Sequence, residues 1–271
     1  MKINLNQKEY YGAIERNSID FYAKKYQVYL EQFKEKKDLK ILDIGGASGM
    51  FASYLSDVFK DNNCEVYVLD STKYEEWEDS ERNVRYIEDT VENLSQHFQK
   101  SSFDIIFMNR VVHHLVYNSW TKTHIMMAEL LKDISGILKS DGRLFICDHF
   151  YNGFIFDNAP SFLIYKLTSC KIPFIVKLCK AFKAESAGVG VCFLSQKNWD
   201  RLLNKADLTI ENAIFGSKGI KKIQHYLLFI GSYSYDNVMM LKSHLSPQGS
   251  PKVAPRFPQG SPENVEGKFY N

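Results

Sequence analysis

The sequence lacks several features that would assign a protein to a broad class at once. Its 34 lysines and arginines face 32 acidic residues, so it has no excess positive charge of the kind that nucleic-acid-binding proteins show. It contains no uncharged apolar run of transmembrane length, and its first residues lack the apolar block of a signal peptide. We therefore expect a soluble, cytoplasmic protein with no nucleic-acid partner.

Cysteine is scarce, and several catalytic motifs are missing. The five cysteines are odd in number and include no Cys-x-x-Cys pair, which predicts free thiols in a reducing compartment. The absence of a Gly-x-Ser-x-Gly elbow disfavours a serine hydrolase. Adjacent histidines lack the i, i+4 spacing of a helical metal site, and Asp148 with Asn109 supplies too few oxygen ligands. We predict no metal.

The 271 residues fit one large α/β domain with appendages, and 45% of them are apolar. Residues 1–38 carry aromatics at helical spacing, which predicts a helical N-terminal cap. We favour packing of these aromatic side chains on the core over a role in closing the entrance to a ligand site. Residues 39–242 form the expected main domain, in which strands alternate with helices until about residue 150.

The most informative segment is a buried strand that runs into a glycine turn and then a helix. Ile41, Leu42 and Ile44 form the apolar strand, and Gly45 and Gly49 permit the close backbone approach of a ligand. The dinucleotide fingerprint would need glycines at the third and sixth positions of the turn, where this sequence has alanine and methionine. A nucleotide-type cofactor remains the best interpretation.

Four further strand patterns follow in a consistent order. Residues 64–70 and 84–90 give strands with acids at their ends, and residues 103–114 give a strand that starts with Phe-Asp and closes with His-His. Residues 142–149 give the fifth. With the Asp-x-Gly-x-x-x-Gly turn, this set resembles the class I S-adenosylmethionine-dependent methyltransferases over residues 39–232. The Phe-Asp and His-His elements resemble the quinone-pathway members, which act on small molecules.

The resemblance implies a Rossmann-like α/β fold and a cofactor site. The expected sheet is mostly parallel and seven-stranded, with helices on both faces and an antiparallel last strand, from final strands at residues 208–215 and 225–232. The residues implied to bind S-adenosyl-L-methionine are Asp43, Gly45, Gly46, Ala47, Gly49, Asp70, Ser71, Asp89, Thr90 and Asn109. Among these, the acid Asp70 would accept hydrogen bonds from the ribose hydroxyls, and Asp89 would face the adenine amino group.

Two histidine segments supply candidate bases, because methyl transfer needs alignment of the acceptor and, where necessary, removal of a proton. His113 and His114 follow the fourth strand, and the resemblance favours His114. His149 closes the fifth strand and is the leading candidate. Its neighbour Asp148 is a poor partner for its ring, since adjacent strand residues point to opposite faces. The alternative that these histidines only pack or hydrogen-bond stays open.

Residues 151–193 form an apolar, aromatic and lysine-rich insertion, for which we expect two short helices split by Pro173. The preferred interpretation of this insertion is a lid over an apolar substrate, and the alternative is a helical pair that only packs on the sheet. The third interpretation is contact with a membrane surface through residues 154–183. The glycines between Gly188 and Val191 predict a hinge or turn, and Ser195 is predicted to cap the helix that follows. Residues 243–271 contain Pro-Gln-Gly-Ser-Pro twice and predict a disordered tail.

The sequence therefore predicts a methyltransferase that acts on a small or medium apolar acceptor by O-, C- or N-methylation, as in small-molecule or natural-product biosynthesis. One alternative is a peptide methyltransferase that modifies its own or a partner's Pro/Gly-rich tail. Another is a cofactor-binding protein of the same fold that has lost catalysis, because fold alone does not fix function. A homodimer also stays open.

Overall fold

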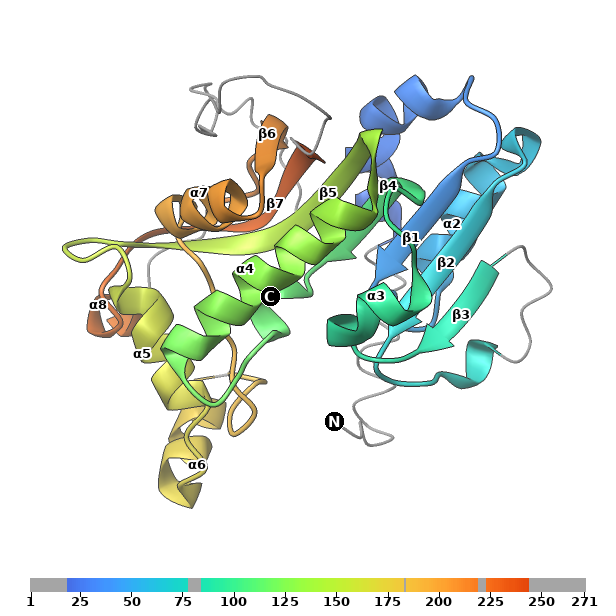
Figure 1. Cartoon of the computed structure of the whole chain (residues 1–271). Helices are drawn as coiled ribbons and strands as arrows, with labels where there is room; N and C mark the ends of the chain where they lie inside the picture. The colour runs from blue at the N-terminus through green and yellow to red at the C-terminus, as the bar shows by residue number, and fades with distance from the viewer. Residues whose placement is uncertain (1–18, 78–83, 183, 219–222, 244–271) are drawn as a thin grey trace. The chain divides into compact units, whose positions relative to one another are not determined.

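The computed structural model describes residues 19–77, 84–182, 184–218 and 223–243, and it contains a seven-stranded sheet (Figure 1). The strands are β1 (Lys40–Ile44), β2 (Glu65–Asp70), β3 (Val84–Glu88), β4 (Phe103–Asn109), β5 (Leu138–Gly153), β6 (Leu208–Ile214) and β7 (Ile230–Ser243). Their order is β3-β2-β1-β4-β5-β7-β6. β1 pairs in parallel with β2 and β4, β2 pairs in parallel with β3, and β6 pairs antiparallel with β7. The expected Rossmann-like sheet is confirmed.

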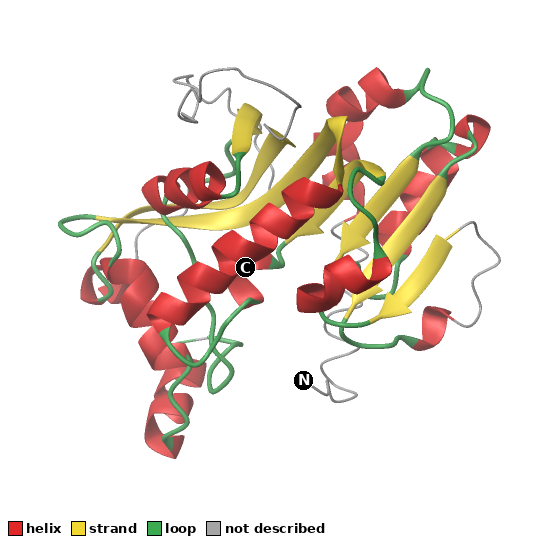
Figure 2. Ribbon diagram, in the orientation of Figure 1, coloured by secondary structure: helices red, strands yellow, loops and turns green. Residues whose placement is uncertain are grey.

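Helices and short 3-10 turns connect these strands (Figure 2). A helix covers residues 19–30, and it is followed by the turn η1 (Glu31–Phe33). The other helices are α2 (Met50–Val58), α3 (Leu94–His97), α4 (Trp120–Ile137), α5 (Ala159–Thr168), α6 (Pro173–Ala181), α7 (Gln196–Lys205) and α8 (Ile223–Leu227), and the other 3-10 turns are η2 (Lys60–Asn62), η3 (Glu75–Trp77), η4 (Val91–Asn93) and η5 (Val112–His114). None of these described helices has both the length and the apolarity needed to cross a membrane.

The chain divides into two compact units, which are described separately. Unit 1 comprises residues 1–109 and 133–145, and unit 2 comprises residues 110–132 and 146–271. Unit 1 therefore contains β1 to β4 and the first half of β5. Unit 2 contains the second half of β5, β6, β7 and the insertion helices.

The core of unit 1 is built on β1 and β4. Every residue of β4 from Phe103 to Met108 is buried, as expected of a strand covered on both faces. Tyr26 from the N-terminal helix packs edge-on against Phe107 and Phe145, with ring centroids 5.0 and 5.4 Å apart. For residues 19–33 of the predicted cap, helical structure and core packing are thus confirmed. Residues 1–18 of that cap lie outside the described residues.

In unit 2 the insertion forms the two expected helices, α5 and α6, and Pro173 is the first residue of α6, where a missing N–H costs nothing. Gly188 and Gly190 have φ of 88° and 100°, so the segment between them is a turn that favours glycine. Ser195 caps α7, since its Oγ accepts a hydrogen bond from Asn198 N at 3.2 Å. These three local predictions are confirmed.

Two strand predictions need correction. The last strand was expected at residues 225–232, but residues 223–227 form α8 and the strand runs from Ile230 to Ser243. Its buried run from Val238 to Leu241 pairs with β6, and this long-range pairing decides the register. β5 is also longer than the predicted 142–149. The predicted tail, apart from Ser243 in β7, lies outside the described residues.

Candidate cofactor turn and histidine cluster

The glycine turn after β1 in unit 1 has the backbone that its sequence predicts. Gly45, Ala47 and Gly49 all have positive φ, at 72°, 47° and 83°. Gly45 N donates to Leu69 O at 2.7 Å, and Gly49 N donates to Gly46 O at 2.8 Å. The turn is therefore fixed to the end of β2 and closed on itself, and it leads directly into α2.

Side chains could not replace two of these glycines. A Cβ at Gly46 would stand 2.6 Å from the Asp43 carboxylate oxygen Oδ2, and a Cβ at Gly49 would stand 2.6 Å from the hydroxyl of Tyr86. Asp43 is 2% exposed, so its carboxylate lies directly against the turn. Its position is that of a support for the glycine turn.

Asp70, the last residue of β2, joins the turn to its own strand end. Its Oδ2 accepts a hydrogen bond from Ala47 N at 3.1 Å, and its Oδ1 accepts one from Thr72 N at 3.0 Å. Burial raises the pKa of Asp70, and backbone N–H donors of Thr72, Ala47 and Ser71 counteract part of that rise. A carboxylate offers about four lone-pair sites, so Asp70 keeps accepting capacity for a ligand hydroxyl.

Two aromatic residues beside the turn were not predicted from the sequence. Trp77 in η3 donates from its indole Nε1 to Ala47 O at 2.9 Å. Its ring stacks on Tyr86 of β3 with centroids 4.9 Å apart and an interplanar angle of 26°. The Glu-Glu-Trp sequence predicts a solvent-exposed segment and does not indicate this contact, which depends on the pairing of β2 with β3.

The remaining predicted cofactor residues lie at strand ends of unit 1 and have varied partners. Asp89 follows β3, and its carboxylate contacts His97 Nε2 at 2.6 Å and accepts from Asn93 Nδ2 at 2.8 Å. Those two hydrogen bonds lower the pKa of Asp89 to about 2. Asn109 accepts a hydrogen bond from the Tyr26 hydroxyl at 2.6 Å. Ser71 and Thr90 are exposed.

These features fit the cofactor that the resemblance implies. The turn leaves no room for side chains at Gly46 and Gly49, while Asp70 retains accepting capacity. Ser48 Oγ is buried and has no hydrogen-bond partner within the described part of the chain, so a polar group is available to a ligand in the turn itself.

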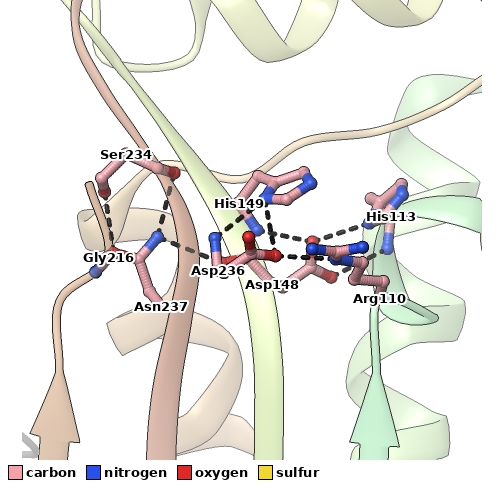
Figure 3. Close-up of polar contacts among 8 residues, drawn as sticks. All are labelled: Arg110, His113, Asp148, His149, Gly216, Ser234, Asp236 and Asn237. Atoms are coloured by element: carbon pink, nitrogen blue, oxygen red, sulfur yellow. Dashed lines mark hydrogen bonds and ion pairs between the residues drawn. The ribbon is translucent and has the colours of Figure 1, made fainter. Parts of the chain in front are cut away.

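A second cluster, in unit 2, is centred on Asp148 of β5. Figure 3 shows hydrogen bonds from His113 and from His149 meeting at this carboxylate. The ring Nδ1 of His113 lies 2.7 Å from Oδ1, His113 N donates to Oδ2 at 3.2 Å, and His149 N donates to Oδ1 at 2.7 Å. Burial alone would raise the pKa of Asp148, but the His113 ring and these N–H donors outweigh it and lower the pKa. Asp148 is therefore ionised at neutral pH.

The hydrogen bonds assign a tautomer to each of the two rings. An ionised carboxylate only accepts, so Nδ1 of His113 carries a proton, and in the neutral ring the lone pair is on Nε2. His149 has the opposite state, because its Nδ1 accepts from Asp236 N at 3.0 Å and the proton of the neutral ring is on Nε2. Burial lowers the pKa of His149 to about 4, so the ring is neutral at pH 7. His113 is thus arranged as an acceptor and His149 as a donor.

His114 occupies a different environment from His113. The two residues lie in η5 rather than on β4, so strand alternation does not separate them. His113 is 7% exposed, whereas His114 is exposed and its ring centroid lies 4.2 Å from that of His113. Desolvation, then the charge of His113, lowers the pKa of His114. The surface that His114 keeps in contact with water limits this lowering.

A polar frame holds the cluster in place (Figure 3). Asn237 of β7 is 1% exposed, and its Nδ2 donates to Asp148 O at 3.1 Å while its Oδ1 accepts from Gly216 N at 3.1 Å. Its Oδ1 also accepts from the Ser234 hydroxyl at 2.8 Å. Arg110 Nε donates to Asp236 Oδ1 at 2.7 Å. The frame connects β5, β7 and the residue that follows β4.

Aromatic rings surround the two histidines. Phe193 stacks on His113 with centroids 4.8 Å apart and lies 4.8 Å from Tyr151, and Tyr235 stands edge-on to His149 at 5.2 Å. Burial, and then the neighbouring Tyr235, raise the pKa of Tyr151, so its phenol stays neutral. The histidines therefore lie between the polar frame and a set of aromatic rings, and these rings suit an apolar ligand.

Comparison with known proteins identifies the family. A family model described as a methyltransferase domain matches residues 14–213, more than half of the chain. The chain belongs to this methyltransferase family. The glycine turn of unit 1 is the segment that the sequence predicts for the cofactor of this family.

Solved structures are similar to this chain at low sequence identity, and of those named here only the first has a TM-score above 0.5. The YcgJ protein from Bacillus subtilis has a TM-score of 0.51 and 17% identity over 84% of this chain and 99% of its own. The mitomycin 7-O-methyltransferase MmcR has a TM-score of 0.48 and 14% identity over 78% of this chain, which spans only 50% of the MmcR chain. The 1,6-didemethyltoxoflavin-N1-methyltransferase from Burkholderia thailandensis has a TM-score of 0.45 and 14% identity over 90% of this chain and 93% of its own. No curated protein matches the sequence.

Sequence reasoning missed several residues of the histidine cluster of this methyltransferase. His113 was considered but not selected, and Arg110, Asp236 and Asn237 carried no motif. The sequence did contain one indication of this cluster. Asp148 lies in a predicted strand and is a poor partner for the His149 ring, so its carboxylate needed a partner from elsewhere in the chain. Among the described residues, no group of three or more His, Cys, Asp or Glu side chains is placed to hold a metal ion.

Proposed function

We propose that this methyltransferase acts on a small or medium apolar acceptor in the cytoplasm, and that His113 is its general base. The observation that carries the proposal is the 2.7 Å contact between His113 Nδ1 and Asp148 Oδ1, which leaves Nε2 as a proton acceptor. This base replaces His149 and His114, the candidates taken from the sequence. Five free cysteines support a reducing compartment.

The chain's own groups divide the work. His113 Nε2 takes the proton that an O–H, N–H or activated C–H acceptor loses, and the Asp148 carboxylate stabilises the imidazolium that forms. His149 donates from Nε2 to a heteroatom of the acceptor and so orients it. When bound, S-adenosylmethionine supplies a methyl group on a positively charged sulfur. We assign Asp70, Ser48 and the backbone of the glycine turn to holding this cofactor.

The rings of Tyr151, Phe193 and Tyr235 around the two histidines support an apolar acceptor. Tyr151 and Phe193 are also the first aromatic and the last aromatic residue of the insertion at residues 151–193. We therefore keep the insertion as the acceptor-binding segment, but assign its contact to these two ends. Phe162 and Phe174 are 41% and 74% exposed and are less suited to enclose a ligand.

The test uses isotope-labelled S-adenosylmethionine and a panel of apolar phenols, amines and activated methylene compounds. His113→Asn retains a donor for Asp148 at the Nδ1 position but has no Nε2, so we expect methyl transfer to fall about 100-fold to 10,000-fold. Asp148→Asn should also slow transfer, because an amide can donate to Nδ1 and reverse the tautomer. Cofactor affinity should be unchanged in both. A normal rate in His113→Asn together with a slow His114→Asn would reverse the assignment.

A further inference from the structure

The helix α6 carries a stripe of apolar side chains that faces solvent rather than the core. Phe174, Leu178 and Phe182 recur every four residues and so share one side of the helix. They are 74%, 45% and 50% exposed, and Ile172 just before the helix is 58% exposed. A surface helix normally turns such a stripe toward the core. Here the side turned inward has Cys179, whose Sγ donates to Leu167 O of α5 at 3.8 Å.

Lysines accompany this stripe without any acidic residue. Lys171, Lys177 and Lys180 are exposed, and no Asp or Glu occurs from residue 158 to residue 184. On the helix, Lys177 is a neighbour of Phe174, because residues three apart share a side, and Lys171 directly precedes Ile172. Lys180 is a neighbour of Lys177 but lies on the side of the helix away from the stripe. The α6 patch, Ile172, Phe174, Leu178 and Phe182 with Lys171 and Lys177, is thus apolar and positively charged.

Three occupants can be compared by their chemistry. A small acceptor needs an enclosing cavity, and side chains that are 45–74% exposed do not enclose one. A second copy of the chain would place the same patch against itself, which brings the lysines of both copies together. An anionic lipid surface offers an apolar layer for the stripe and phosphate groups for the lysines.

We propose that the α6 patch binds this methyltransferase to the surface of an anionic membrane. The apolar stripe enters the boundary between headgroups and acyl chains, and Lys171 and Lys177 contact the headgroup phosphates. The helix lies along the surface, and none of the described helices needs to cross the bilayer. This partner is additional to the proposed function and does not depend on the identity of the base.

The test is flotation of the full chain with lipid vesicles. The wild-type protein should float with vesicles of phosphatidylcholine containing about one third phosphatidylserine, and not with phosphatidylcholine alone. Binding should decrease as salt is raised to about 0.5 M, because the lysine contribution is screened. Phe174→Glu and Leu178→Glu should each reduce vesicle binding about tenfold or more, as should the pair Lys171→Glu and Lys177→Glu.

Val28→Glu is the matched control, since Val28 is 76% exposed but lies on the N-terminal helix. It should float as the wild type does, and all these variants should bind S-adenosylhomocysteine normally by calorimetry. The proposal is overturned if the wild type stays unbound by the mixed vesicles, or if Phe174→Glu binds them as well as the wild type. It is also overturned if the wild type is a dimer without vesicle affinity and Phe174→Glu is a monomer.

Discussion

A loss of stability below neutral pH should reveal the proton state of His149. Its Nδ1 accepts the Asp236 N–H in the fold, and burial lowers its pKa from 6.5 to about 4. Between these two values the unfolded chain binds a proton that the folded chain does not, so the free energy of unfolding falls as the pH falls from about 6.5 to 4. At about 1.4 kcal/mol for each unit of pKa, His149 alone should account for about 3 kcal/mol.

The assay is denaturant unfolding of the wild type and His149→Asn at pH values from 7 to 4. The Oδ1 atom of asparagine can accept the Asp236 N–H but does not titrate. The variant also loses the packing of the His149 ring against Tyr235, which lowers its free energy of unfolding by the same amount at every pH. The comparison therefore uses only the change in the free energy of unfolding with pH. The wild type should lose about 3 kcal/mol more than His149→Asn across the range. Parallel curves for the two proteins would refute a neutral, buried His149.

Three further predictions address the glycine turn, the cofactor and the tail. Gly49→Ala places a Cβ against Tyr86 at a φ of 83° and should lower the free energy of unfolding by about 1–3 kcal/mol. In Gly136→Ala the new Cβ meets no atom within 4 Å, so this variant should raise the free energy of unfolding by about 0.5–1 kcal/mol. Equal changes in the melting temperature of the two variants would contradict this contrast. Asp70→Asn should weaken S-adenosylhomocysteine binding about tenfold by calorimetry, and an unchanged affinity would remove Asp70 from the cofactor site. Intact mass should not change when the full chain is incubated with cofactor; added methyl groups mapped to residues 243–271 would establish self-methylation instead.

The sheet and the glycine turn were predictable because their determinants are local. The apolar run from Ile41 to Ile44 and the glycines at 45 and 49 specify a buried strand and a turn with positive φ, whatever the rest of the chain does. The cap at Ser195 and the start of α6 at Pro173 are local in the same sense. For the cofactor site, the sequence therefore indicated the segment that the structure builds.

The histidine cluster was less predictable because its geometry depends on long-range contacts. Strand alternation correctly separated the Asp148 carboxylate from the His149 ring, but the partners that replaced it are distant: His113 in η5 and the Asp236 backbone in β7. The register of β7 was itself misplaced, since α8 occupies residues predicted to be strand. A ring's tautomer follows from such partners, and no spacing rule in the sequence encodes it.

The two proposals are connected through the physical state of the acceptor. Each methylene group of an apolar acceptor favours lipid over water by about 0.8 kcal/mol, so a long-chain acceptor is concentrated in a membrane. With such an acceptor dissolved in anionic vesicles, Phe174→Glu should lower the rate of methyl transfer, because the enzyme no longer binds where the acceptor is. With a short, water-soluble analogue the same variant should match the wild type. Phe193→Ala, which removes the ring stacked on His113, should slow both reactions. If Phe174→Glu slowed both acceptors equally, α6 would contact the acceptor directly, as a lid does, and the membrane would have no part in its delivery.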